Sequence, residues 1–363
     1  MGNSLGKIFN ITCFGESHGT CLGILVDGCP AGLPLSQADI QPELDKRRAG
    51  RTTGSTTRGE KDEVEILCGV YNGFTTGAPI GMLTWNKDVD SGDYKKNKFA
   101  LRPGHADYTA FVKYGGFNDI RGGGRFSGRI TVALAMAGAI ARKLLGLTGI
   151  EVLAHTIEIG GIKAAPKEIA EIKRNAAQSP LRCADPKAAD EMAKLIEKAE
   201  KEQDSIGGIV EGIALNVPAG LGEPVFENLD GELAKALLAI PAAKAVEFGA
   251  GFNAARMRGS ENNDPFTIKD GKIVTTTNNA GGILGGISNG MPVVVRVAVK
   301  PTASISRSQE TVDINKMEKT TISVMGRHDV CIVPRAVPAV AAMMAVTLCD
   351  FALRAGLIPR VIK

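Results

Sequence analysis

The sequence has few groups that could hold a metal ion. Its seven cysteines include no CxxC pair, and its four histidines include no H-x-H or H-x-x-x-H spacing of the kind that binds zinc. Most of the cysteines lie in apolar runs, where a free thiol packs as a small hydrophobic group and stays reduced in the cytoplasm. We therefore expect no metal site.

Long apolar runs and a large excess of charge are also missing. The apolar run 336–348 is shorter than the ~20 residues that a membrane-spanning helix needs, and no secretory leader opens the chain. The net charge of +4 is too small to indicate a nucleic-acid partner by itself. We expect a cytoplasmic protein that binds neither membrane nor nucleic acid. No linker rich in proline, glycine or serine marks a boundary, so we predict one domain over 1–363.

Glycine, in contrast, is abundant, with 44 residues dispersed through apolar segments. Two of these segments, 130–145 and 336–355, are helix-like and apolar on every face. A helix without a polar stripe has to be covered on all sides, so we predict a helical layer between sheets. Strand-like runs before and after the first helix, and amphipathic surface helices at 166–203, complete the prediction of one α+β domain.

The segment RGGGRFSGR, residues 121–129, carries three arginines and four glycines directly before the first apolar helix. Glycines expose backbone N–H groups, and together with a helix N-terminus and Arg125 and Arg129 they would bind a phosphate or carboxylate. Arginine–glycine RNA-binding tails come as repeats in disordered surroundings, whereas this copy is single. A structured anion site is the favoured interpretation, and a solvated basic turn is the alternative.

A second basic segment, DKRRAGRTTGSTTRGE at 45–60, has no apolar periodicity. We predict a mobile surface loop there. It is either simply solvated or a lid that orders on an anionic ligand.

Three of the histidines lie in short polar and glycine-rich contexts: FGESHG (His18), RPGHAD (His105) and GRHD (His328). Imidazole has a pKa near neutrality, so a loop histidine beside a carboxylate or arginine is a candidate general acid. His155 lies within a strand-like run and is interpreted as structural. The glycine-rich turn at 278–290 and the polar end of the strand at 293–304 could pack against a planar ring and hold a phosphate.

One motif points to a different class of enzyme. GAGFNA at 249–254 matches the dinucleotide fingerprint and would suggest an NAD-dependent oxidoreductase. The segment that follows, ARMRGSENNDPF, is not helical in pattern, so the required strand-turn-helix context is lacking. We discount this alternative, as we do an RNA-binding module.

Taken together, the motifs closely resemble the chorismate synthase family. The blocks FGESHG, RRAG, RPGHADYT, RGGGRFSGR, NNAGGILGGISNG, KPTASI and GRHDVCIVPRAVP appear in the family's order and span nearly the whole chain. The resemblance implies a β-α-β sandwich with buried apolar helices between antiparallel sheets. It also implies a phosphate lyase of the shikimate pathway, which makes chorismate by anti 1,4-elimination from 5-enolpyruvylshikimate 3-phosphate and requires reduced FMN.

The resemblance also implies residue roles. The catalytic residues would be His18, His105 and Asp329. The substrate, with two carboxylates and a phosphate, would be bound by Ser17, Arg47, Arg48, Arg102 and Arg129. The FMN cofactor would be bound by Arg125, Phe126, Ser127, Pro241, Ala242, Gly285, Lys300, Pro301, Thr302, Ala303, Ser304 and Arg327, the last also a substrate candidate.

Some positions depart from the family pattern. Thr53 stands where a further arginine is usual and Ala49 where proline is common, while Phe126 and Pro241 replace a small residue and an asparagine. These departures affect single contacts and leave the reaction unchanged. The family further implies a homotetramer, and FMN is reduced either by the enzyme itself with NADPH or by an external flavin reductase.

Overall fold

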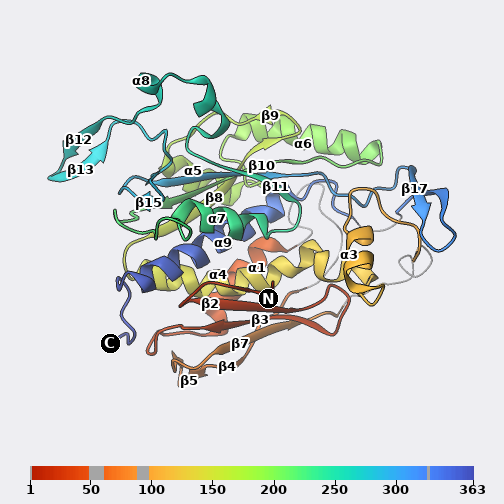
Figure 1. The fold of residues 1–363 in the computed structure, drawn as a ribbon, viewed down its shortest axis with the longest axis horizontal. Helices are drawn as coiled ribbons and strands as arrows, with labels where there is room; N and C mark the ends of the chain where they lie inside the picture. Colours follow the sequence, from red (N-terminus) through yellow and green to blue (C-terminus); the bar gives the residue numbers. More distant parts are fainter. Residues whose placement is uncertain (1, 49–60, 88–97, 325–327) are drawn as a thin grey trace.

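The computed structural model describes residues 2–48, 61–87, 98–324 and 328–363. Two antiparallel sheets enclose a layer of helices, as Figure 1 shows. The first sheet has the order β1 (Ser4–Leu5), β2 (Asn10–Gly15), β3 (Cys21–Asp27), β7 (Ile80–Trp85), β4 (Glu65–Cys68). The second has the order β11 (Ala243–Phe248), β16 (Val293–Val299), β10 (Gly208–Leu215), β8 (Glu151–Ile159), β9 (Ile162–Lys163). The predicted α+β sandwich is confirmed.

The helical layer is built on α4 (Thr131–Gly146) and α9 (Val333–Arg354), close to the ranges predicted from their apolar character. Both helices are almost fully buried, because sheet or helix covers every face. They approach closely at Gly138, where a Cβ atom would come within 2.4 Å of the Cβ of Ala342. Any larger residue at Gly138 would push the helices apart, so glycine is needed there.

Helix α9 is long and apolar enough to cross a membrane, but every residue of its apolar window is buried inside the fold. It is therefore a core helix of this fold. Its N-terminus lies at Val333, three residues before the predicted start, and Pro334 occupies the first turn, where a missing N–H does no harm. One apolar core runs from Phe9 to Ile358. A single domain over 1–363 stays a prediction, which this shared core supports.

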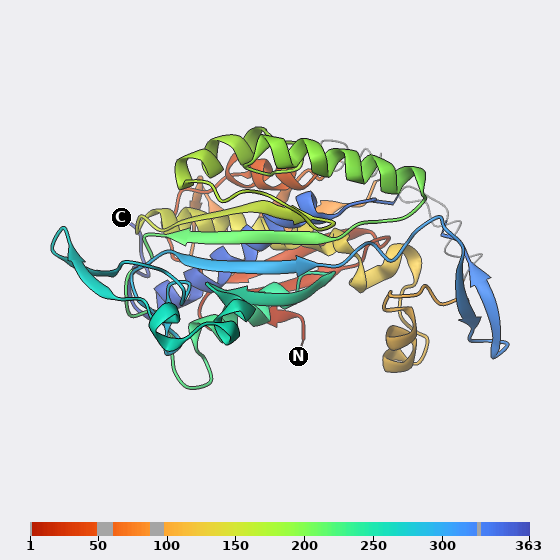
Figure 2. The ribbon, with the colours of Figure 1, turned by 90° about the horizontal axis from the view of Figure 1, so that it is seen from above.

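The remaining elements lie around this sandwich. The predicted surface helices at 166–203 are α5 (Ile169–Gln178) and α6 (Pro186–Lys201), which run along the second sheet (Figure 2). The hairpin β12 (Phe266–Lys269) and β13 (Lys272–Thr275) projects from the body, as Figure 2 shows. The other elements are α1 (Gln37–Arg47), β5 (Val70–Tyr71), β6 (Phe74–Thr75), α3 (Asp107–Tyr114), α7 (Leu229–Leu238), α8 (Gly259–Asn262), β14 (Ile283–Leu284), β15 (Ile287–Ser288), β17 (Gln309–Asp313) and β18 (Glu318–Ile322).

One expectation needs correction. The segment beginning at Asp45 was predicted to be a mobile surface loop, but its first residues complete helix α1 and Arg47 is only 2% exposed. Its charge is paired inside the protein, which the local sequence does not reveal. Residues 49–60, including Ala49 and Thr53, lie outside the described residues. Residues 251–254 of the discounted GAGFNA motif begin a short 3-10 helix, η3 (Gly251–Arg256), in place of the α-helix that a dinucleotide fingerprint requires.

The cysteines are free, and Cys29, Cys183, Cys331 and Cys349 are buried as expected, whereas Cys68 is exposed. Burial raises the pKa of the Cys331 thiol to about 12, so this thiol stays protonated at neutral pH.

Candidate active site

A cavity of about 740 Å³ opens at one end of the helical layer. This volume is in the range of small-molecule and cofactor sites. Its lining includes residues from the first turn of both buried helices, Thr131 of α4 and Ala336 of α9. The N-terminus of a helix carries partial positive charge and exposes N–H groups. Two such ends meeting at one cavity favour an anionic ligand.

The side chains of the lining add to this field. Cations outnumber carboxylates: Arg47, Arg102, Arg125, Arg129, Lys244, Lys300 and Arg335 line the cavity with Asp62 and Asp329. Excess positive charge in a partly enclosed cleft concentrates anions and raises their rate of association. The cavity is therefore suited to a small molecule with several negative charges.

The glycine turn at residues 121–126 lies at the wall of this cavity. Gly122, Gly123 and Gly124 have φ values of +58°, +84° and +51°, which glycine adopts without strain. A Cβ atom on Gly122 would lie 2.4 Å from Nε2 of His18, and one on Gly123 would lie 3.1 Å from Nε2 of His105. The missing side chains let both imidazoles approach the same turn.

His105 belongs to a cluster at the start of α3. Its Nδ1 lies 2.7 Å from Oδ1 of Asp107, which also accepts a hydrogen bond from Nη2 of Arg102 at 2.7 Å. Burial alone would raise the pKa of Asp107, but hydrogen bonds from Arg102 and His105 outweigh it and hold that pKa well below its usual range. The ionised Asp107 favours a proton on Nδ1 and directs Nε2 toward the glycine turn.

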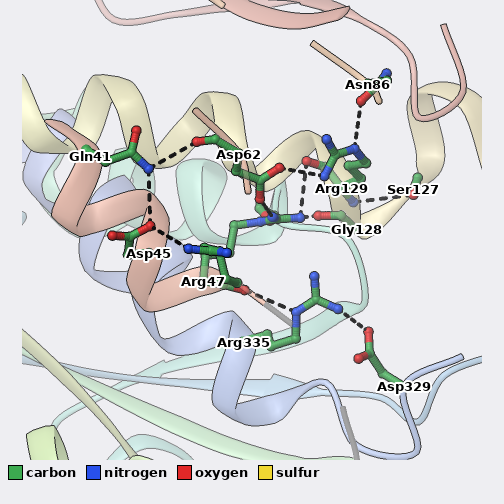
Figure 3. A network of polar contacts seen from close by, with 12 residues as sticks. Gln41, Asp45, Arg47, Asp62, Asn86, Ser127, Gly128, Arg129, Asp329 and Arg335 are labelled. Atoms are coloured by element: carbon green, nitrogen blue, oxygen red, sulfur yellow. Dashed lines mark hydrogen bonds and ion pairs between the residues drawn. The ribbon is translucent and has the colours of Figure 1, made fainter. Parts of the chain in front are cut away.

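A second network joins the predicted substrate arginines (Figure 3). Asp62 accepts from Nη1 of Arg47 through Oδ2 and from Nη1 of Arg129 through Oδ1, each at 2.9 Å. Nε of Arg47 donates to Thr131 at 2.7 Å, and Nε of Arg129 donates to Asn86 at 2.8 Å. Both arginines are thus held at more than one point.

Asp329 lies in the loop before α9, six positions before Arg335. Nη1 of Arg335 lies 2.5 Å from Oδ2 of Asp329, and Nε of Arg335 donates to the backbone carbonyl of Arg47 at 3.2 Å (Figure 3). Arg335 therefore ties the Asp329 carboxylate to the end of helix α1. Both side chains line the cavity.

Arg125, predicted from the sequence to bind an anion, also contacts the first sheet. Its guanidinium donates to the backbone carbonyls of Gly15 at 3.0 Å and Cys13 at 3.2 Å, and to Oδ1 of Asn3 at 2.9 Å. These acceptors belong to the first sheet and its leading loop. In this structure Arg125 fastens the glycine turn to strand β2.

The opposite wall brings together two segments that are far apart in the sequence. The backbone N–H of Lys300 donates to the carbonyl of Ala242 at 3.0 Å, and Nζ of Lys300 donates to the carbonyl of Gly104. Nη1 of Arg102 lies 3.4 Å from the hydroxyl of Ser304. The hydroxyl oxygen of Thr302 is buried and has no hydrogen-bond partner, so this wall retains an unused polar group beside the cavity.

Most of the residues named from the sequence line the cavity: Arg47, Arg102, His105, Arg125, Phe126, Ser127, Arg129, Pro241, Ala242, Lys300, Pro301, Thr302, Ala303, Ser304 and Asp329. Ser17 and His18 are buried behind Gly122, which does line it. Arg48 lies at the end of α1 against Asp45, and Gly285 lies between β14 and β15, both outside the lining. Arg327 is outside the described residues.

Sequence reasoning missed Asp62, Asn86, Asp107, Lys244 and Arg335. Asp107 had a signal, because it follows His105 by two positions in RPGHAD. Asp62 and Asn86 had none, since only the fold brings them to the arginines. Among the described residues, no group of three or more histidine, cysteine or acidic side chains is placed to hold a metal ion.

Comparison with known proteins gives one consistent result. A family model described as chorismate synthase matches residues 9–353. Proteins named chorismate synthase include one from Dehalococcoides mccartyi, 59% identical over 363 residues with full coverage of both chains. Another, from Methanosarcina barkeri, is 54% identical over 357 residues, covering 98% of each. A solved structure, "Crystal Structure of Chorismate Synthase", matches with a TM-score of 0.75 and 32% identity, covering 96% of this chain and 93% of the other.

Proposed function

The chain belongs to the chorismate synthase family, and we propose that the cavity at the N-termini of α4 and α9 is its active site. The protein is a phosphate lyase of the shikimate pathway. It eliminates phosphate from 5-enolpyruvylshikimate 3-phosphate in an anti 1,4 sense to give chorismate. The observation that carries the site assignment is the convergence of arginines, both helix N-termini and His105 on one cavity.

The substrate has two carboxylates and a phosphate, so binding must compensate the cost of removing these charges from water. We assign this task to Arg47, Arg102 and Arg129, with Arg48 at the margin and Ser17 behind the glycine turn. Guanidinium groups pair with carboxylates and phosphates through two parallel hydrogen bonds. The buried setting of Arg47 and Arg129 strengthens such pairing relative to a surface site.

The family needs reduced FMN, and the residues present fit such a cofactor. The wall formed by Pro241, Ala242 and Lys300 to Ser304 offers apolar surface, one cation and the unpartnered Thr302 hydroxyl. Phe126 and Ser127 face the same cavity, whereas Gly285 and Arg327 remain family-based proposals. When bound, reduced FMN supplies electron density to the allylic system as phosphate leaves.

Three side chains are proposed to handle protons. Asp107 holds the Nδ1 proton of His105, so His105 acts in its imidazolium form, donates the second proton from Nε2 and neutralises charge as phosphate departs. His18, whose ring lies against Gly122, is proposed to donate a proton on the flavin side. Asp329 supplies the carboxylate base, and its ion pair with Arg335 fixes the orientation of the carboxylate.

The experiment that tests this assignment compares His18→Ala and His105→Ala with wild type, each loaded with reduced FMN. We expect a folded protein whose turnover falls by about 10²-fold or more, in line with a lost general acid. His155→Gln is the matched control, because His155 lies on strand β8 outside the cavity lining, and its turnover should stay near wild type. Wild-type rates in both active-site variants contradict the roles.

The source of electrons and the assembly are further proposals. Either the protein reduces FMN with NADPH itself or a separate flavin reductase does so. An anaerobic assay of the pure protein with FMN, NADPH and substrate, with and without dithionite, distinguishes these. We also propose a cytoplasmic homotetramer without a nucleic-acid partner, for which light scattering at several protein concentrations is the test.

A further inference from the structure

We propose that Asp62 is a positioning residue, which holds Arg47 and Arg129 as a preformed receptor for an acidic group of the substrate. The inference rests on the proposed function, since it takes both arginines as substrate ligands. Asp62 itself reaches the substrate only through them. The residue lies three positions before strand β4, and no motif in the sequence marks it.

The geometry is that of a bridge. Each carboxylate oxygen of Asp62 takes one guanidinium, with Nη1 of Arg47 and Nη1 of Arg129 both at 2.9 Å (Figure 3). The side chains of Asp62 and Arg47 are 2% exposed and that of Arg129 is 6% exposed. Water therefore screens these ion pairs little, and the carboxylate fixes the distance between two cations that would otherwise repel each other.

A carboxylate in a cavity that binds an anion is unfavourable, because its charge repels the ligand and its burial costs desolvation free energy. Its presence needs a compensating role. Two long side chains lose rotamer freedom when they are fixed, and a receptor that is fixed before binding avoids that loss at the binding step. With Asp62 ionised, the trio still leaves one positive charge for the substrate.

The backbone at Asp62 is itself held in place. Nε2 of Gln41 donates to the carbonyl of Asp62 at 3.2 Å, and the N–H of Val64 donates to Oε1 of Gln41 at 3.0 Å. Gln41 belongs to α1, the helix that also carries Arg47. Asp62 has φ of +45°, a conformation that aspartate and asparagine adopt more readily than other side chains. Asn is therefore the substitution that preserves the backbone.

The test is Asp62→Asn, with KM for 5-enolpyruvylshikimate 3-phosphate, FMN affinity by flavin absorbance and thermal stability measured together. The amide oxygen can accept a hydrogen bond from one arginine, but the amide N–H groups face the other, so one guanidinium loses its acceptor and is no longer held in position. We expect KM to rise on the order of tenfold or more while FMN affinity changes little. Asp350→Asn is the matched buried-carboxylate control. It should lower stability and leave KM unchanged, because Asp350 lies outside the cavity lining.

The variants Arg47→Lys and Arg129→Lys distinguish a failure of the Asp62 proposal from a failure of the proposed substrate site. If neither changes KM, the assignment of the substrate site fails whatever Asp62→Asn does. If both raise KM and Asp62→Asn leaves it unchanged or lowers it, Asp62 does not position them and the proposal is overturned. Combining Asp62→Asn with Arg129→Lys should give less than the sum of the single effects, because both act through one contact.

If Asp62→Asn does not fold, the variant Gln41→Met tests the proposal instead. It removes the hydrogen bonds that hold the Asp62 backbone and keeps the carboxylate. We then expect a smaller rise in KM with FMN affinity unchanged, and an unchanged KM overturns the proposal.

Discussion

His18 and His105 lie against consecutive glycines of one turn, the former against Gly122 and the latter against Gly123. They come from different parts of the fold, since His18 follows strand β2 and His105 precedes helix α3. The turn itself is positioned by the N–H of Ser17, which donates to the carbonyl of Gly124 at 3.2 Å. The spacing of the two proposed proton donors therefore depends on the glycine turn, whose missing side chains leave room for both rings.

This relationship predicts the effect of Gly122→Ala. The new methyl group would lie 2.3 Å from Cδ2 of His18, at φ of +58°, so the ring has to move. We expect turnover to fall by about 10²-fold, similar to the loss of a general acid. Gly149→Ala is the control, since Gly149 has φ of +78° with nothing within 4 Å of a built Cβ. If Gly149→Ala loses as much turnover as Gly122→Ala, backbone strain alone explains the loss and the contact with His18 does not.

The low pKa of Asp107 predicts a pH dependence of stability. Its folded-state pKa is depressed, so the carboxylate stabilises the fold above its unfolded value of about 3.9, and this contribution is lost as pH falls toward the folded value. Asp107→Asn should therefore be less stable than wild type at pH 7, and the difference in free energy of unfolding should shrink below about pH 4. Urea unfolding between pH 7 and pH 3 measures it, and a constant difference contradicts it.

Much of the fold follows from pattern alone. Residues 130–145 lack any polar face, and such a helix has to be buried on all sides, as it is in the layer between the sheets. The glycine turn was predicted to form an anion site, and it does line the cavity. These features are local, because hydrophobic periodicity and glycine conformation act over a few residues.

The partners of each cation were not predictable. Arg47 and Arg125 look alike in sequence, each in a basic, polar stretch. In the fold both line the cavity, but Arg47 pairs with Asp62, whereas Arg125 donates to carbonyls of strand β2. Which carboxylate or carbonyl meets a guanidinium depends on the packing of distant segments, and a single sequence carries no record of that.

The contacts of Arg125 predict a mainly structural loss on substitution. Arg125→Met removes hydrogen bonds to the carbonyls of Gly15 and Cys13 and leaves those partly buried acceptors without this donor. We expect the FMN-free protein to lose about 2–3 kcal/mol in free energy of unfolding. Chemical denaturation without FMN measures this. A direct phosphate ligand would instead lower FMN affinity and leave the stability of the FMN-free protein unchanged.

Asp350 provides the last prediction, at the far end of helix α9 from the cavity. Its Oδ1 accepts backbone N–H groups from Lys7 at 3.0 Å, Ile8 at 2.7 Å and Phe9 at 2.9 Å, and its side chain is buried. One carboxylate therefore anchors the loop that leads into strand β2. Asp350→Ala leaves those N–H groups without this acceptor and should cost about 3–5 kcal/mol in free energy of unfolding.

Asp350→Asn retains an oxygen acceptor and should cost less, about 1–2 kcal/mol, because a neutral amide accepts more weakly than a carboxylate. Urea unfolding of both variants measures the difference, and KM measured on the folded protein should not change in either. An equal cost for the two variants would mean that the side chain stabilises the loop by packing. A change in KM would mean that strand β2 transmits the disturbance to His18, since β2 ends at Gly15, just before the turn that carries this histidine.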